Sequence, residues 1–83
     1  MRLGYRALKE GGTSPATLNA ANEIAVTAFL ERRLPFLAIT SVIEAVMNEL
    51  GPRALTGLGE VLEADAAARR HAESQIAAMR VRP

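Results

Sequence analysis

The feature that most constrains this chain is a run of fifteen residues, 16–30, that contains neither glycine nor proline. The run follows Thr13, Ser14 and Pro15. A hydroxyl side chain at either of the first two positions can cap a helix, and proline suits the first helical position because no amide donor is needed there. The pattern therefore predicts a helix that begins near Thr13 and ends at about Arg33.

Two stripes of side chains recur along this predicted helix at spacings of three and four residues. The first stripe is apolar and consists of Leu18, Ala21, Ala25, Ala28 and Phe29. The second stripe is mostly polar and consists of Asn19, Asn22, Glu23 and Val26. Residues at these spacings share a helix face, so the helix has two faces, and we expect each face to have a neighbour.

The second stripe is the candidate functional feature of the chain, and three interpretations of it stay open. Its side chains could be solvated, or they could satisfy backbone groups of a loop within the same domain. The third interpretation is a contact with another domain, because the small Ala20 and Ala21 beside the stripe would let a second backbone approach closely. Direct catalysis by Glu23 is not indicated.

Two amphipathic helices are predicted on either side of this one. Met1, Tyr5 and Leu8 lie at positions i, i+4 and i+7, which predicts a short helix that Gly11 or Gly12 ends. After Pro35, apolar residues at helical spacing predict a third helix, which Gly51 and Pro52 close; its apolar face is Phe36, Ile39, Val42, Ile43, Val46, Met47 and Leu50.

The last part of the chain is predicted to be a loop followed by a helix. Gly, Pro and small residues over 51–59 indicate a connector, with one helical turn over 58–63. Asp65 is expected to be the N-cap of the final helix, which reaches about Met79 and has the apolar stripe Ala68, Ala72, Ile76 and Met79. The expected fold is a single all-α domain over residues 1–83, a small bundle of about four helices.

Composition argues against several classes of function. Ten basic and nine acidic residues are scattered along the chain, so no positive stripe suited to nucleic acid is present. The chain has no cysteine, which excludes disulfides and thiolate zinc sites and fits a reducing compartment. No apolar run approaches the ~18 residues of a membrane span, and no signal-peptide pattern is present, so we expect a cytoplasmic protein without nucleic-acid or membrane partners.

The sequence predicts no catalytic, cofactor-binding or metal-binding residue. His71 is the single histidine, and Arg69 and Arg70 beside it oppose a cation. No serine has a histidine and a carboxylate suggested as partners, so nucleophilic catalysis is not indicated.

Several of these segments together match the pattern of a known family over nearly the whole chain. The matching positions are Gly11-Gly12-Thr13, Leu18 to Glu23, Ala25-Val26, Ala28-Phe29-Leu30, Phe36, Val61-Leu62, Asp65, Ala66, Ala68 and Arg69. At these positions the chain resembles the C-terminal helical domain of 1-deoxy-D-xylulose 5-phosphate reductoisomerase. Leu37 and Ala38 depart from the family, in which a polar capping residue and an aspartate are expected after the phenylalanine.

The resemblance implies a parent enzyme rather than a site within this chain. Members of the family are NADPH-dependent homodimers that use magnesium or manganese. They convert 1-deoxy-D-xylulose 5-phosphate to 2-C-methyl-D-erythritol 4-phosphate in non-mevalonate isoprenoid biosynthesis. The dinucleotide-binding and catalytic domains of the family precede the matched region, so no cofactor or metal residue is carried over to this chain. The expected role is a supporting domain with those two domains as partners. The alternative is a stand-alone helical interaction module that binds through the second stripe.

Overall fold

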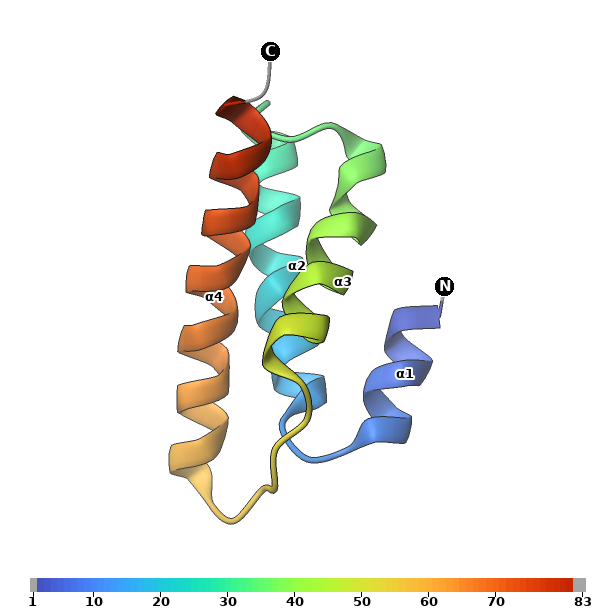
Figure 1. The fold of residues 1–83 in the computed structure, drawn as a ribbon, viewed down its shortest axis with the longest axis vertical. Coiled ribbons are helices and arrows are strands. Elements are labelled where there is room, and N and C mark those ends of the chain that lie inside the picture. The colour runs from blue at the N-terminus through green and yellow to red at the C-terminus, as the bar shows by residue number, and fades with distance from the viewer. Residues whose placement is uncertain (1, 82–83) are drawn as a thin grey trace.

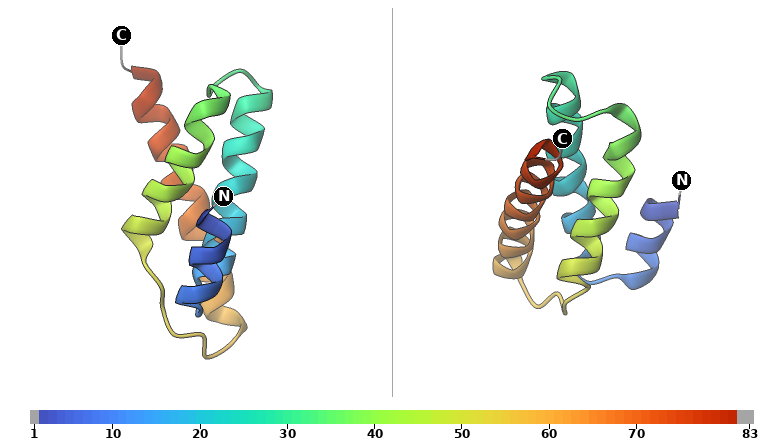
Figure 2. Two further views of the ribbon diagram at one scale, coloured as in Figure 1. Left: turned by 90° about the vertical axis from the view of Figure 1, so that its right-hand side faces the viewer. Right: turned by 45° about the horizontal axis from the view of Figure 1, so that its top comes forward.

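The structure is a computed structural model that describes residues 2–81. Over this range the chain forms four α-helices and one short 3₁₀ helix, with no strand (Figure 1). Their bounds are α1 Arg2–Glu10, α2 Ser14–Leu30, η1 Phe36–Ala38, α3 Ile39–Leu50 and α4 Leu58–Val81. Three helices, α2, α3 and α4, lie side by side, and the short α1 packs against the first half of α2 (Figure 2). The predicted all-α bundle of about four helices is confirmed.

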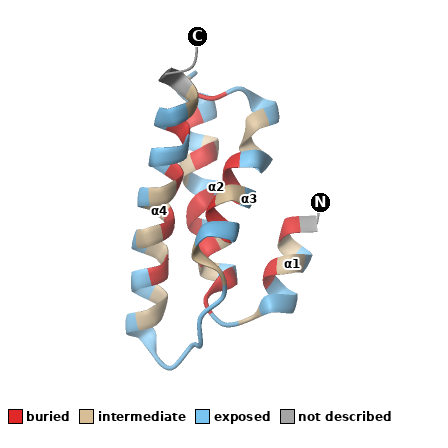
Figure 3. Ribbon diagram, viewed as in Figure 1, coloured by how far each residue is buried: buried red, intermediate tan, exposed pale blue. Residues whose placement is uncertain are grey.

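The core lies where α2, α3 and α4 meet, and small side chains contribute much of it (Figure 3). Alanine has a short side chain, so helices that meet through alanines can approach closely. This explains how a chain with only 4% aromatic residues forms a continuous core. The buried residues of these helices include Ala20, Ala21, Ala25, Ala28, Val42, Ile43, Val46, Met47, Ala64, Ala68, Ala72 and Ile76.

The apolar stripe expected on α2 is confirmed at its alanines and is wrong at Phe29. The side chain of Phe29 is exposed and meets Phe36 edge-to-face, with ring centroids 5.5 Å apart. Phe36 itself is 66% exposed, so its assignment to the buried face of the third helix was also wrong. The two rings cover each other at the turn between α2 and α3 instead of entering the core.

The buried face of α1 differs from the expected one. Tyr5 and Leu8 are exposed, whereas Leu3 and Ala7 are buried against the bundle. Both pairs have helical spacing, and α1 has only nine residues, so apolar periodicity alone could not distinguish the two faces. Met1, the third member of the expected face, lies outside the described residues.

The ends of α2 are set by backbone hydrogen bonds. Thr13 precedes the helix without a side-chain cap hydrogen bond, so the expected hydroxyl cap was wrong. The helix ends at Leu30, a few residues before the expected end, because Arg32 adopts a left-handed conformation with φ 64°. The amide of Arg33 then donates to the carbonyl of Ala28 at 2.8 Å, which is the Schellman type of helix end.

The third predicted helix is confirmed at its C-terminus and begins differently. Its first turn, Phe36–Ala38, is 3₁₀, and no side chain caps either this turn or α3. Gly51 ends α3 as expected, with φ 63° and its amide bonded to the carbonyl of Met47 at 2.9 Å. A left-handed φ carries little steric cost for glycine, which explains its place at this helix end.

The last helix is longer than predicted, because α4 is continuous from Leu58 to Val81. Asp65 lies inside α4 and is not its N-cap. Its carboxylate accepts a hydrogen bond from Nε of Arg69, one turn later, at 2.8 Å. Ala64 is buried one turn before Ala68, so the apolar stripe continues towards the start of the helix. Gly59, the second residue of α4, does not interrupt the helix.

Candidate docking surface

A groove of about 350 Å³ runs between α1 and the first half of α2. Its lining residues are mostly apolar, with two asparagines among them: Gly4, Ala7, Leu8, Pro15, Leu18, Asn19 and Asn22. The side chain of Leu8 is 77% exposed, and Tyr5 on the same short helix is 68% exposed. Leu8 and Tyr5 are thus large apolar side chains that this domain leaves unburied.

Two members of the predicted polar stripe, Asn19 and Asn22, lie at this groove, and both are exposed. Asn22 makes no side-chain hydrogen bond with any residue that the structure describes, so its amide has a donor and an acceptor to offer. The amide nitrogen of Asn19 donates to Oε2 of Glu23 at 3.4 Å, a long hydrogen bond at the surface.

Glu23, the third member, contacts α4 through Arg69. Nη2 of Arg69 donates to Oε1 of Glu23 at 2.9 Å, and Nε of Arg69 donates to Asp65 at 2.8 Å. The hydrogen bond from Arg69 holds the pKa of Asp65 below its usual range. The pKa of Arg69 is raised, first by the hydrogen bond to Asp65 and then by the one to Glu23. Arg69 thereby joins α2 to α4 at the surface.

Val26, the last member, is half-buried. The stripe therefore does not lie on a face that all the neighbouring helices leave open, because its polar residues line the groove with α1 or pair with α4. The structure thus brings Asn19 and Asn22 together at the α1–α2 groove, whereas Glu23 is held by α4.

Sequence reasoning missed parts of this surface. Leu8 was assigned to a buried face, yet it forms a wall of the groove. The ion pair between Glu23 and Arg69 joins residues 46 positions apart, and no local pattern signals such a pair. The pairing of Asp65 with Arg69 follows the ordinary i, i+4 spacing of a helix.

The described residues offer little to a metal ion. Over residues 2–81 no group of three or more His, Cys, Asp or Glu side chains is placed to hold one. His71 is half-buried on α4 and lies beside Arg70 and Ser74. Within the same range, no helix has both the length and the apolar character that crossing a membrane requires.

The fold and the groove define a small helical domain with a partly apolar groove between α1 and α2. Comparison with known proteins identifies the family. Residues 1–71 match the family model described as the DXP reductoisomerase C-terminal domain, where DXP is 1-deoxy-D-xylulose 5-phosphate. The chain belongs to this family.

Individual relatives agree with this assignment. The chain is 55% identical over 76 residues to the 1-deoxy-D-xylulose 5-phosphate reductoisomerase of Paraburkholderia phymatum, and 56% identical over 77 residues to that of Burkholderia cenocepacia. These matches cover 92% and 93% of this chain and 19% of each relative. The chain therefore spans about a fifth of the length of these relatives.

A solved structure extends the similarity to three dimensions. The reductoisomerase of Zymomonas mobilis, in complex with NADPH, matches with a TM-score of 0.84 and 38% sequence identity. The match covers 89% of this chain and 20% of that one.

Proposed function

We propose that this chain is the supporting domain of a 1-deoxy-D-xylulose 5-phosphate reductoisomerase and has no catalytic activity of its own. The observation that carries the proposal is the family match over residues 1–71. The 0.84 TM-score with the Zymomonas mobilis enzyme supports it independently. Because the relatives are about five times as long as this chain, the reaction is assigned to the rest of such an enzyme.

The whole enzyme is proposed to convert 1-deoxy-D-xylulose 5-phosphate to 2-C-methyl-D-erythritol 4-phosphate with NADPH and a magnesium or manganese ion. The described residues of this chain do not fit these groups, since they include neither a cluster of metal-ligating side chains nor a strand followed by a glycine-rich turn. We propose that NADPH and the metal ion bind in the dinucleotide-binding and catalytic domains of the whole enzyme. On the basis of the family resemblance, we also propose that the whole enzyme is a cytoplasmic homodimer that acts in isoprenoid biosynthesis.

The groove between α1 and α2 is proposed as the surface that contacts those domains. The occupant is the remainder of the same polypeptide, because the relatives contain about four-fifths of their length outside the matched region. The exposed Leu8 supplies apolar area to bury, and the free amide of Asn22 supplies hydrogen-bonding groups for a second backbone.

The activity is tested by a direct assay of the full-length polypeptide that contains this chain. With 1-deoxy-D-xylulose 5-phosphate and magnesium or manganese, we expect NADPH to be consumed by the full-length polypeptide and not by the 83-residue chain alone. No NADPH consumption by the full-length polypeptide with either metal would contradict the proposal.

The alternative, a stand-alone helical interaction module, would bind a separate protein through the stripe of Asn19, Asn22, Glu23 and Val26. Sequencing the DNA upstream of the codon for Met1 distinguishes the two functions. A long open frame that encodes a strand, a glycine-rich turn and clustered acidic residues supports the enzyme, and an in-frame stop codon just upstream supports the module.

A further inference from the structure

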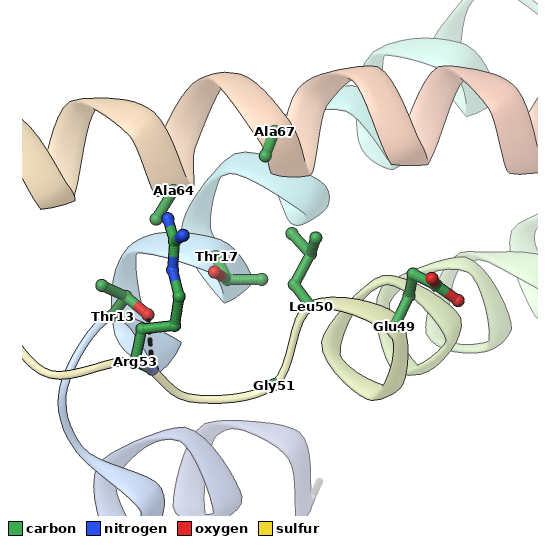
Figure 4. Close-up of a pocket in the computed structure, with 8 residues that line it drawn as sticks. All are labelled: Thr13, Thr17, Glu49, Leu50, Gly51, Arg53, Ala64 and Ala67. Atoms are coloured by element: carbon green, nitrogen blue, oxygen red, sulfur yellow. Dashed lines mark hydrogen bonds between the residues drawn. The ribbon is translucent and has the colours of Figure 1, made fainter.

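A second cavity, of about 140 Å³, lies where α2 begins and α3 ends (Figure 4). It is separate from the α1–α2 groove, and the two sets of lining residues do not overlap. The cavity is lined by Thr13, Thr17, Glu49, Leu50, Gly51, Arg53, Ala64 and Ala67.

The hydroxyl of Thr17 is the unusual group at this cavity. Thr17 is only 2% exposed, and its Oγ1 has no hydrogen-bond partner among the described residues. A threonine inside a helix commonly bonds to a carbonyl one turn earlier, and buried hydroxyls in native proteins nearly always have a partner. Figure 4 shows the oxygen on the side of Thr17 that faces Thr13 and Arg53. The oxygen therefore lies on the side of Thr17 where the polar groups of the cavity are found.

Further polar groups surround the same space. Oγ1 of Thr13 accepts a hydrogen bond from the backbone amide of Arg53 at 3.0 Å, which leaves the hydroxyl hydrogen of Thr13 to donate. The guanidinium of Arg53 reaches Glu63 only at 3.8 Å, so it keeps N–H groups for another acceptor. In addition, α3 ends at Leu50, and the last carbonyls of a helix lack donors within that helix.

The size of the cavity and its polar groups suit a water molecule. Arg53 and Glu49 both line it, but Figure 4 shows the Glu49 carboxylate directed away from Arg53, whose guanidinium lies 3.8 Å from Glu63. Leu50, Ala64 and Ala67 make the rest of the wall apolar. A water molecule needs about 10–15 Å³ of such volume and two to four polar partners, and this cavity supplies both.

We propose that this cavity is a structural water site. At least one ordered water molecule is hydrogen-bonded to Oγ1 of Thr17 and links α2 to the Arg53 loop and the end of α3. The inference is independent of the enzyme proposed above, because it concerns only the packing of this domain.

The substitution Thr17→Val tests the proposal in the full chain, because valine has the shape of threonine and a similar helix propensity. In a dry cavity, the exchange removes an unpaired buried hydroxyl and raises the midpoint of thermal unfolding. In a hydrated cavity, it removes a partner of the water and lowers that midpoint. Thr27→Val is the matched control, since Thr27 lies on the same helix and is exposed.

We expect Thr17→Val to lower the midpoint below that of the Thr27→Val control. A midpoint equal to the control or above it overturns the proposal. Crystal structures of the wild type and of Thr17→Val give a second readout. A density peak within hydrogen-bonding distance of Oγ1 that is lost in the valine variant supports the proposal, and a cavity without such a peak in the wild type overturns it.

Discussion

The backbone carbonyl oxygen of Arg53 lies in the space that a β-carbon on Gly12 would occupy. This close approach lets the loop after α3 reach the start of α2. The amide of Thr13 donates to the carbonyl of Arg53 at 3.0 Å, and the amide of Arg53 donates back to the hydroxyl of Thr13 at 3.0 Å. Glycine at position 12 is therefore required both for the approach and for its left-handed φ of 55°.

The substitution Gly12→Ala should lower the free energy of unfolding by about 2–4 kcal/mol, because it adds a backbone clash to left-handed strain. Gly11→Ala separates the two causes, since Gly11 has φ 68° and open space around it. Gly11→Ala should lower the free energy of unfolding by about 1–2 kcal/mol from strain alone.

Gly59→Ala, in open space within α4, should instead raise the free energy of unfolding by about 0.5–1 kcal/mol. Urea unfolding of the chain measures the free energy of unfolding of all three variants. Equal losses for Gly12→Ala and Gly11→Ala would show that the carbonyl of Arg53 adds no steric penalty at position 12.

Close packing through alanine is tested at Ala25, which is fully buried in the centre of α2. Ala25→Leu forces extra volume between helices that meet through small side chains, and it should destabilise the chain by about 1–3 kcal/mol. Ala77→Leu is the matched control, because Ala77 is exposed on α4 and the same change there should stay within about 0.5 kcal/mol. Equal unfolding midpoints in urea for the two variants would show that the core around Ala25 accommodates a larger side chain without loss of stability.

The pairing of Arg69 with Asp65 predicts a dependence of stability on pH. The pKa of Asp65 is lower in the folded state than its unfolded value of about 3.9. The pair therefore stabilises the fold above that pH, and the stabilisation is lost as the pH falls through the folded pKa. From about pH 5 to about pH 2.5, the wild type should lose more stability than Asp65→Asn. Both side chains are well solvated, so the difference should be small and should shrink in high salt.

Urea midpoints at both pH values, for the wild type and for Asp65→Asn, measure this effect. Glu44→Gln is the control, because Glu44 is exposed and forms no ion pair with the described residues. It should lose as much stability as the wild type over the same range. An Asp65→Asn variant with the full wild-type loss would contradict a stabilising role for the pair.

Sequence patterns predicted the helices better than they predicted which faces are buried. Helix spacing and glycine placement located α2 and the end of α3 because these signals are local. The face of α1 was wrong because nine residues with apolar groups on two sides carry no preference until α2 packs against one of them. The hydroxyl of Thr13 was assigned to a cap, whereas its partner is Arg53, 40 residues away.

The site was predictable to a smaller degree for the same physical reason. The polar stripe on α2 could be recognised from spacing, and its two asparagines do line a groove. The groove itself depends on where α1 packs against α2. The hydrogen bond from Arg69 to Glu23 depends on the packing of α4 against α2. Neither relationship is encoded in a local run of residues. The role of the stripe as a contact between domains stays a prediction.

That role can be tested by Asn22→Leu in the full-length polypeptide. Leucine removes the free amide at the groove, so contact with the remaining domains should weaken, while the chain's own thermal midpoint should hardly change because Asn22 is exposed and makes no hydrogen bond with the described residues. Asn48→Leu, at an exposed position on α3, is the matched control. Faster cleavage between domains in limited proteolysis is expected for Asn22→Leu only. The same cleavage rate for both variants would remove Asn22 from the interface.

The most direct test of the central claim is hydrogen exchange of the α1 amides in the full-length polypeptide and in the 83-residue chain. α1 has nine residues, and its main contact is with α2, so it should open easily when the groove is uncovered. If the rest of the enzyme covers the groove, α1 should exchange more slowly in the full-length polypeptide, while α3 should change little. Equal exchange of α1 in the two proteins would contradict docking through the α1–α2 groove.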